Sequence, residues 1–310
     1  MKKKNSRSNE ERFSSNRIIV LGVMRSGTSL TAELIRLWGA YAGNRNHLWE
    51  SNVNDPRGYG YMEYIPLQDL NNEILDNNDR VPPLVGSLDQ KISSSKYRGQ
   101  AKSLLQTMDD MAKKDRVDAW VWKDARLPLT LPFWSDLWGD VIYVITIRHP
   151  AEIALSLAQA AEIDKENLPY SAGFIYWQYC MLQVLSFTQH SRRKIFIGYD
   201  QLMDNPLQEC TRLSTFLDHH CERSSGDSQK RIDTMLPRVA KNEQHQHYDI
   251  SLAEMHQATR EQRALYNFLR VKILYPDETF NPDDFALYPG WREYLESVDM
   301  LMTLQGAKDM

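Results

Sequence analysis

The first candidate for chemistry is a short loop in which two glycines stand five residues apart. Gly22 and Gly27 flank Arg25, and Thr28 and Ser29 follow. The spacing is that of the Walker A loop, whose backbone N–H groups hold phosphate at the start of a helix, but threonine stands where that motif has lysine. The loop can therefore cradle an anion while lacking the side chain that favours a magnesium-bound triphosphate. A simple glycine-containing turn is the alternative interpretation.

A second pair of candidate anion ligands lies further along the chain. Arg148 ends an apolar run, and Ser156 follows eight residues later, about two turns into the next expected helix. Taken singly, an arginine at a strand end is usually a surface charge, and a helical serine usually bonds its own backbone. Together with the loop they predict two separate anion sites. A donor with phosphate groups at two places needs both, whereas ordinary ATP or GTP does not.

Alternating strands and helices must position these residues. Apolar, β-branched runs typical of strands buried on both faces occupy residues 17–23, 119–122, 141–147 and 194–198. Helical patterns occupy residues 30–38, 66–75, 97–114, 129–138, a segment opened by Pro150, 170–190 and 206–217. Asn205 and Gln208 predict an N-cap with a capping box. We therefore expect an α/β fold, three-layer α/β/α, whose central and mostly parallel sheet binds ligands at the carboxyl ends of its strands.

The domain organisation follows from the same pass along the chain. Residues 1–16 are polar and predict a disordered tail, and residues 17–310 predict one domain. Its core is expected at 17–218, with a helical C-terminal part at 219–310. The segment 44–64 is rich in Asn, Asp, Gly and Tyr and shows no period, which predicts an irregular loop of the kind that often carries function.

Composition excludes several classes of protein. The chain has 310 residues, 42% hydrophobic and 25% charged, and a net charge of -4, which disfavours a general nucleic-acid binder. Three cysteines are an odd number and no disulfide framework, so a reducing compartment is expected. The sequence shows no signal-peptide core and no apolar run long enough to span a bilayer. We therefore expect a cytoplasmic protein without an integral membrane segment.

Three segments resemble one known family. Residues 23–30 are similar to the 5′-phosphosulfate loop of sulfotransferases that use 3′-phosphoadenosine-5′-phosphosulfate (PAPS), in the bacterial form that has arginine instead of lysine. Residues 148–156 resemble the family's 3′-phosphate motif. Tyr199-Asp-Gln-Leu202, followed by Asn205-Pro206, resembles its Tyr-Glu-Asp-Leu segment. The resemblance covers roughly residues 17–217.

The resemblance implies a P-loop NTPase-like fold and PAPS as the sulfuryl donor, with no metal expected. The acceptor would be a hydroxyl on a sugar, glycan, lipid or small molecule, and the sequence does not determine the oligomeric state. The implied donor-binding residues are Arg25, Ser26, Gly27, Thr28, Ser29, Arg148, Ser156 and Tyr199.

Candidate catalytic residues come from two further segments. Sulfuryl transfer should be an in-line displacement helped by cations around the leaving oxygen, by analogy with phosphoryl transfer. Arg25 and Lys123 are the candidate cations, since Lys123 begins a segment resembling the Lys-Asp-Pro motif of some sulfotransferases. The loop around Asp55 resembles one whose acid lies close to the acceptor, which makes Glu63 the candidate base. His47 or Asp55 from the same loop could substitute for it.

Other interpretations stay open at this point. Asp124 after an apolar strand can be read as a Walker B acid, which would make the chain a magnesium-dependent kinase or nucleotide hydrolase. A binding module that keeps the nucleotide pocket without catalysis is a third possibility.

The clusters His219-His220-Cys221 and His245-x-His247 lack partners at structural-zinc spacing, so we discount them as metal sites. Aromatic residues of the irregular loop that could stack on a sugar acceptor are Trp49, Tyr59 and Tyr61.

Overall fold

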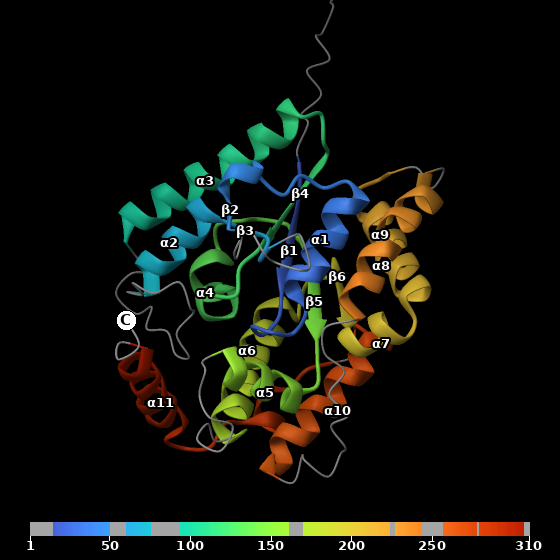
Figure 1. The fold of residues 1–310 in the computed structure, drawn as a ribbon. Coiled ribbons are helices and arrows are strands. Elements are labelled where there is room, and N and C mark those ends of the chain that lie inside the picture. The colour runs from blue at the N-terminus through green and yellow to red at the C-terminus, as the bar shows by residue number, and fades with distance from the viewer. Residues whose placement is uncertain are drawn as a thin grey trace, which may run out of the picture.

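The structure is a computed structural model, and it describes residues 15–49, 60–75, 94–160, 170–223, 227–243, 257–277 and 279–306. Its centre is a four-stranded sheet in the order β4-β1-β5-β6, in which every neighbouring pair is parallel (Figure 1). The strands are β1 (Asn16–Leu21), β4 (Ala119–Lys123), β5 (Ile142–Ile147) and β6 (Lys194–Gly198). The four predicted strands are confirmed. The first strand lies between two later ones, so the crevice at its carboxyl end is a topological switch point where ligands bind in such sheets.

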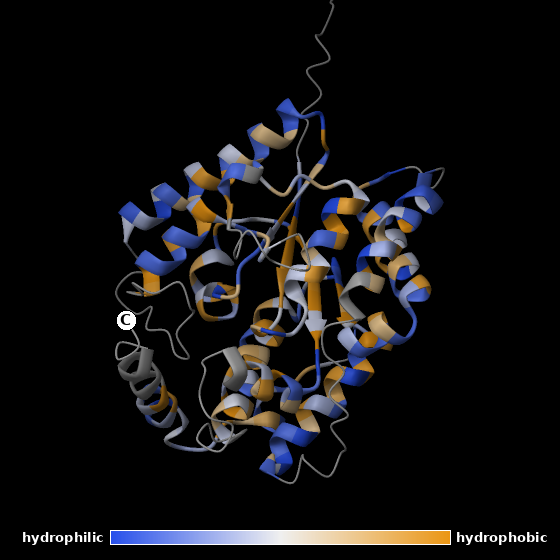
Figure 2. Ribbon diagram, in the orientation of Figure 1, coloured by the Kyte–Doolittle hydropathy of each residue, from blue (hydrophilic) through white to orange (hydrophobic). Residues whose placement is uncertain are grey.

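Side-chain alternation along the strands builds two hydrophobic cores, one on each face of the sheet. Ile18 and Val20 of β1 point to one core, whereas Ile19 and Leu21 point to the other. Figure 1 shows α1, α8 and α9 on one side of the sheet and α2, α3 and α4 on the other. In Figure 2 the strands are mainly hydrophobic, and the outer helices carry hydrophilic residues. The predicted three-layer α/β/α arrangement is confirmed.

The helices divide between the two faces. The face of Ile18 is covered by α1 (Thr28–Trp38), α7 (Tyr199–Asp204), α8 (Pro206–His220) and α9 (Ser228–Glu243). The opposite face is covered by α2 (Ile65–Leu75), α3 (Ser95–Lys114), α4 (Leu127–Trp134), α5 (Pro150–Ala160), α6 (Tyr170–Thr188), α10 (Arg260–Leu274) and α11 (Trp291–Gly306). Within the described ranges, none of these helices has both the length and the apolar character needed to cross a bilayer.

Helix ends agree with the sequence in some places and differ in others. Gly39 ends α1 in the left-handed conformation, and α5 begins at Pro150, both as predicted. Asn205 is the N-cap of α8 as predicted, but the predicted capping box is wrong, because the side chain of Asn205 makes no hydrogen bond to the first turn of α8. The preceding six residues form α7, a short helix that was not predicted.

The irregular loop predicted for residues 44–64 is wrong at both ends. A short helix at Arg45–His47 leads into β2 (Leu48–Trp49), which pairs antiparallel with β3 (Glu63–Tyr64). Two-residue strands carry too little pattern to be seen in a sequence. The tail predicted for residues 1–16 also ends too late, because β1 already begins at Asn16, and residues 1–14 lie outside the described ranges.

The turn after β1 requires a glycine. A Cβ atom on Gly22 would lie 2.1 Å from Thr146 Oγ1 and 2.8 Å from Ser26 Oγ, at a φ of +152° that side chains rarely adopt. We expect Gly22→Ala to lower the free energy of unfolding by about 1–3 kcal/mol, measured by urea denaturation. The control is Gly99→Ala in α3, where a Cβ meets nothing within 4 Å, and it should raise stability by about 0.5–1 kcal/mol. Equal effects of the two variants would contradict this account of the turn.

Candidate functional site

The glycine loop joins β1 to α1 in a compact turn. Arg25 has a φ of +71° and Gly27 a φ of +93°, so both lie in the left-handed region. The Ser26 N–H donates to the carbonyl of Val23 at 3.0 Å. Gly27 is the N-cap of α1 and provides no side chain to cap the first-turn N–H groups. The loop thus presents the positive end of a helix beside an arginine, which is the arrangement of an anion site.

The loop is fastened to the neighbouring strand β5. Ser26 Oγ and Thr146 Oγ1 form a buried hydrogen bond of 2.7 Å, and Thr146 Oγ1 also donates to the carbonyl of Leu21. The hydroxyl and the N–H of Ser26 therefore both have partners within the protein. Thr146 was missed by the sequence reasoning, because a threonine inside an apolar strand looks like any other β-branched residue.

The two anion motifs, far apart in sequence, meet in space. Arg25 Nε donates to Ser156 Oγ at 2.8 Å, and Arg148 Nη1 donates to the carbonyl of Arg25 at 3.0 Å. The Arg148 guanidinium lies over the ring of Tyr199, 4.4 Å from its centroid. The same ring is so close to Gly27 that a Cβ there would lie 2.6 Å from Tyr199 Cδ2. The carboxyl ends of β1 and β5 and the start of α7 thus form one polar cluster.

Arg148 carries an unsatisfied donor inside this cluster. Its side chain is 6% exposed, and Nε is paired with Glu152 Oε2 at 2.6 Å. Arg148 Nη2 is buried and has no hydrogen-bond partner among the described residues. A buried donor without a partner costs about 1–3 kcal/mol, and such groups in folded proteins usually mark a ligand, an ion or water. An anion at Nη2 would satisfy it.

Glu63 and Lys123 form a second buried cluster. Lys123 Nζ donates to Glu63 Oε1 at 2.5 Å, and the Ala125 N–H donates to the same oxygen at 3.1 Å. Glu63 Oε2 accepts from Gln68 Nε2 at 2.9 Å and lies 3.4 Å from Arg126 Nη1. Burial raises the pKa of Glu63, and the positive charge of Lys123 opposes part of that increase. The carboxylate is therefore a buried ion-pair partner and not a solvated loop acid.

Asp124, the possible Walker B acid, has no free oxygen. Asp124 Oδ1 accepts from the N–H and from Nη1 of Arg126 at 2.9 and 3.1 Å. Asp124 Oδ2 accepts from Asn71 Nδ2 at 2.7 Å, and Asn71 in turn accepts from Trp134 Nε1. The acid is thus a structural partner of the residues around it.

The second cluster lies next to the glycine loop. Lys123 is in register with Val20, two residues before the loop begins. Ser29 Oγ, in the first turn of α1, donates to the carbonyl of Tyr61, which leads into β3 and Glu63. The polar groups that sequence reasoning missed here are Gln68, Asn71 and Arg126. Arg126 stands three residues after Lys123, yet nothing in that spacing shows that it reaches Glu63.

Some sequence candidates fall elsewhere. His47 is exposed, and its ring lies 6.0 Å from that of Tyr64, near β3 but outside the buried cluster. His219 and His220 lie side by side on α8, with ring centroids 4.9 Å apart. No three His, Cys, Asp or Glu residues within the described ranges are grouped as metal ligands. Positions that lie outside the described residues are Asp55, Tyr59, His245, His247 and the side chain of Trp49.

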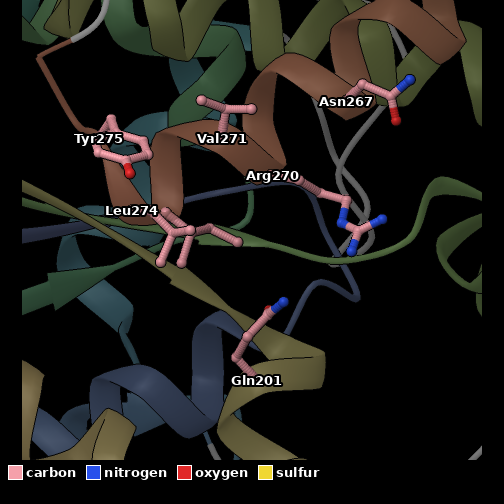
Figure 3. Close-up of a pocket in the computed structure, with 7 residues that line it drawn as sticks. Gln201, Asn267, Arg270, Val271, Leu274 and Tyr275 are labelled. Atoms are coloured by element: carbon pink, nitrogen blue, oxygen red, sulfur yellow. The ribbon is translucent and has the colours of Figure 1, made fainter.

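A pocket of about 550 Å³ opens beside α7 (Figure 3). Gln201 of α7 lies opposite residues of α10, among them Asn267 and Arg270, and Tyr275, which follows the end of that helix. The neighbouring Asp200 has a pKa raised to about 6, mainly by burial and by Glu152, while the charges of Arg148 and Arg270 oppose the increase. Helix α10 thus brings a cation near the Arg148 cluster.

Comparison with known proteins identifies related sequences and structures. A family model described as "Sulfotransferase family" matches residues 17–223. The sulfotransferase domain of the Synechococcus PCC 7002 olefin synthase superposes with a TM-score of 0.48 at 14% identity, covering 85% of this chain and 98% of that domain. The sulfotransferase domain from the curacin biosynthetic pathway gives 0.45 at 16% identity, covering 83% and 98%. A Mycobacterium tuberculosis H37Rv sulfotransferase gives 0.42 at 15% identity, covering 84% and 76%. Curated proteins give no significant match.

The raised pKa of Asp200 predicts a pH-dependent cost to stability. Between its ordinary pKa of 3.8 and about 6, the folded protein holds the proton more tightly than the unfolded chain does. The free energy of unfolding should therefore fall as the pH rises through this window. We expect Asp200→Asn to be more stable than the wild type by about 1–3 kcal/mol at pH 8, with the difference vanishing near pH 4.

Urea denaturation at both pH values measures this difference. The matched control is Asp233→Asn, an exposed acid on α9, which should change stability little at either pH. A stability gain of Asp200→Asn that is the same at pH 4 and pH 8 would rule out the titration of Asp200 as its cause.

Proposed function

The chain belongs to the sulfotransferase family, and on that premise we propose that it transfers a sulfuryl group from PAPS to a hydroxyl acceptor. The observation that carries the proposal is the buried Nη2 of Arg148 beside the glycine loop, which has no hydrogen-bond partner in the described part of the chain. A guanidinium held in this way is preorganised for a phosphate, because its other nitrogens are already fixed and its planar fork matches phosphate oxygens.

The two anion sites fit the two anionic ends of PAPS. The 5′-phosphosulfate would lie on the glycine loop, against Arg25 and the first-turn N–H groups of α1. The 3′-phosphate would lie on Arg148 and Ser156, with Tyr199 beneath the guanidinium. Because Arg25 already bonds Ser156, the two sites share a side-chain contact. Occupying one site would therefore help to order the other.

The chemical step assigns one role to each catalytic side chain. The acceptor oxygen attacks sulfur as the bond between sulfur and the bridging phosphate oxygen breaks, leaving adenosine 3′,5′-bisphosphate. Lys123 would stabilise the charge that develops on the leaving oxygen, and Arg25 the charge on the phosphosulfate. Glu63 would accept the proton of the acceptor hydroxyl. Since Lys123 and Glu63 are bonded to each other at 2.5 Å, that bond has to open before either can act.

The alternatives are less well supported by the same residues. A magnesium-dependent kinase or nucleotide hydrolase would use the lysine that the loop lacks and an acid with free oxygens, whereas both oxygens of Asp124 are taken. A binding module without catalysis would keep the Arg148 site but would not need the Lys123–Glu63 pair. Among acceptors, a carbohydrate stays a prediction that rests on the aromatic residues around Tyr61.

Calorimetric titration with adenosine 3′,5′-bisphosphate tests the donor assignment. We expect binding that does not depend on Mg²⁺, that is stronger than the binding of ATP, and that weakens about 10- to 150-fold in Arg148→Ala, because charge-assisted hydrogen bonds are lost. Arg192→Ala removes an exposed arginine near β6 and should leave the affinity unchanged. Thermal unfolding of both variants checks that they fold. Magnesium-dependent ATP binding that is indifferent to Arg148 would refute the proposal.

A further inference from the structure

Four buried ionisable side chains form one electrically balanced cluster next to the glycine loop. Glu63 and Asp124 supply two negative charges, and Lys123 and Arg126 supply two positive charges. Their side chains are between 0 and 4% exposed. A buried ion without a partner of opposite charge is costly. If one charge leaves this cluster, its former partner therefore depends on the remaining ions for stabilisation.

The two cations are held very differently. Among the described residues, Lys123 Nζ is bonded to Glu63 Oε1 alone. Arg126 is fixed at several points: Nε donates to Asn72 Oδ1 at 2.5 Å, and both Nη1 and the backbone N–H donate to Asp124. It also stands at the N-terminal end of α4, and its carbonyl accepts from Thr130. Lys123 can therefore leave Glu63 by rotating one flexible side chain, whereas Arg126 cannot.

We propose that Arg126 is a positioning residue that keeps Glu63 ionised and in place when Lys123 turns from Glu63 to the transferred sulfuryl group. The proposal rests on the proposed function. With Lys123 withdrawn, Glu63 keeps the neutral donors Gln68 and the Ala125 N–H, and Arg126 is the cation that remains beside it.

The charges around Glu63 determine its pKa and therefore how readily it can accept a proton. Burial and the charge of Asp124 raise the pKa of Glu63, whereas Lys123 and Arg126 lower it. When Lys123 leaves, that pKa rises and the carboxylate becomes a stronger base at the moment when the donor engages the lysine. Without Arg126 as well, Glu63 would be a buried anion with no cationic partner from the described segments. It would then take up a proton from solvent before an acceptor could supply one.

Nuclear magnetic resonance of ¹³C-labelled glutamate tests the effect of Arg126 without relying on any transfer activity. Lys123→Met imitates the departure of the lysine. We expect the Glu63 carboxyl to titrate with a midpoint at least one pH unit higher in Lys123→Met/Arg126→Gln than in Lys123→Met. Equal midpoints in the two proteins would overturn the proposal.

The pH profile of PAPS turnover gives the second readout, with a hydroxyl acceptor taken from a screen of sugars, glycans, lipids and small molecules to receive the sulfuryl group. It is followed as release of adenosine 3′,5′-bisphosphate. In Arg126→Gln the acid limb of the profile should move at least one unit to higher pH, while Arg126→Lys, which keeps the charge, should stay near the wild type. A purely structural role would lower thermal stability and leave the limb in place, which would contradict the proposal.

Asp124→Asn keeps the experiment decisive if Arg126→Gln does not fold. Replacing Asp124 removes the carboxylate that shares Arg126 with Glu63, so the acid limb must move to lower pH. An acid limb of the pH–rate profile that stays in place or moves to higher pH would overturn the proposal. If the wild type releases no bisphosphate from PAPS with any of these hydroxyl acceptors, the proposed function fails, while the glutamate titration still decides whether Arg126 controls the charge of Glu63.

Discussion

A charge that is buried in a protein has to be paired, and this constraint organises the site at the carboxyl end of the sheet. Lys123 and Arg126 are paired with Glu63 and Asp124 on the β4 side, and Arg148 is paired with Glu152 on the β5 side. Among the described residues, hydrogen bonding is complete around the first cluster's charges and incomplete in the second, where Arg148 Nη2 has no partner. In the proposed function, the complete cluster would provide groups for chemistry, and the incomplete one would provide affinity for an anion.

The sheet topology makes both clusters possible. Because β1 lies between β4 and β5 and all are parallel, their carboxyl ends meet at one edge, and the glycine loop rises from the central strand. The Ser26–Thr146 hydrogen bond fixes the loop to β5, and the close approach of Gly22 to Thr146 leaves no room for a larger residue. A donor lying across this edge would contact both clusters, so opening the Lys123–Glu63 pair can be coupled to donor binding.

The strands, the glycine loop and the position of the two anion motifs at neighbouring strand ends could be predicted from the sequence, because each depends on local pattern or on the rule that parallel strands end at one edge. Glu63 came from a family resemblance, and nothing in its neighbourhood indicated that it is buried. Arg126 contacts Glu63 across a sequence separation of 63 positions, and Asn71 contacts Asp124 across 53 positions. Contacts at such separations leave no periodic signal in the sequence. The two-residue strands that carry Glu63 into the cluster were invisible for the same reason.

A crystal structure of the protein with adenosine 3′,5′-bisphosphate tests the central claim most directly. The account predicts one phosphate on the loop between Gly22 and Thr28 and the other within hydrogen-bond distance of Arg148 Nη2 and Ser156 Oγ. The nucleotide would then supply the one partner that the buried guanidinium lacks among the described residues. A bisphosphate bound elsewhere, or one that leaves Nη2 without a partner, would contradict it.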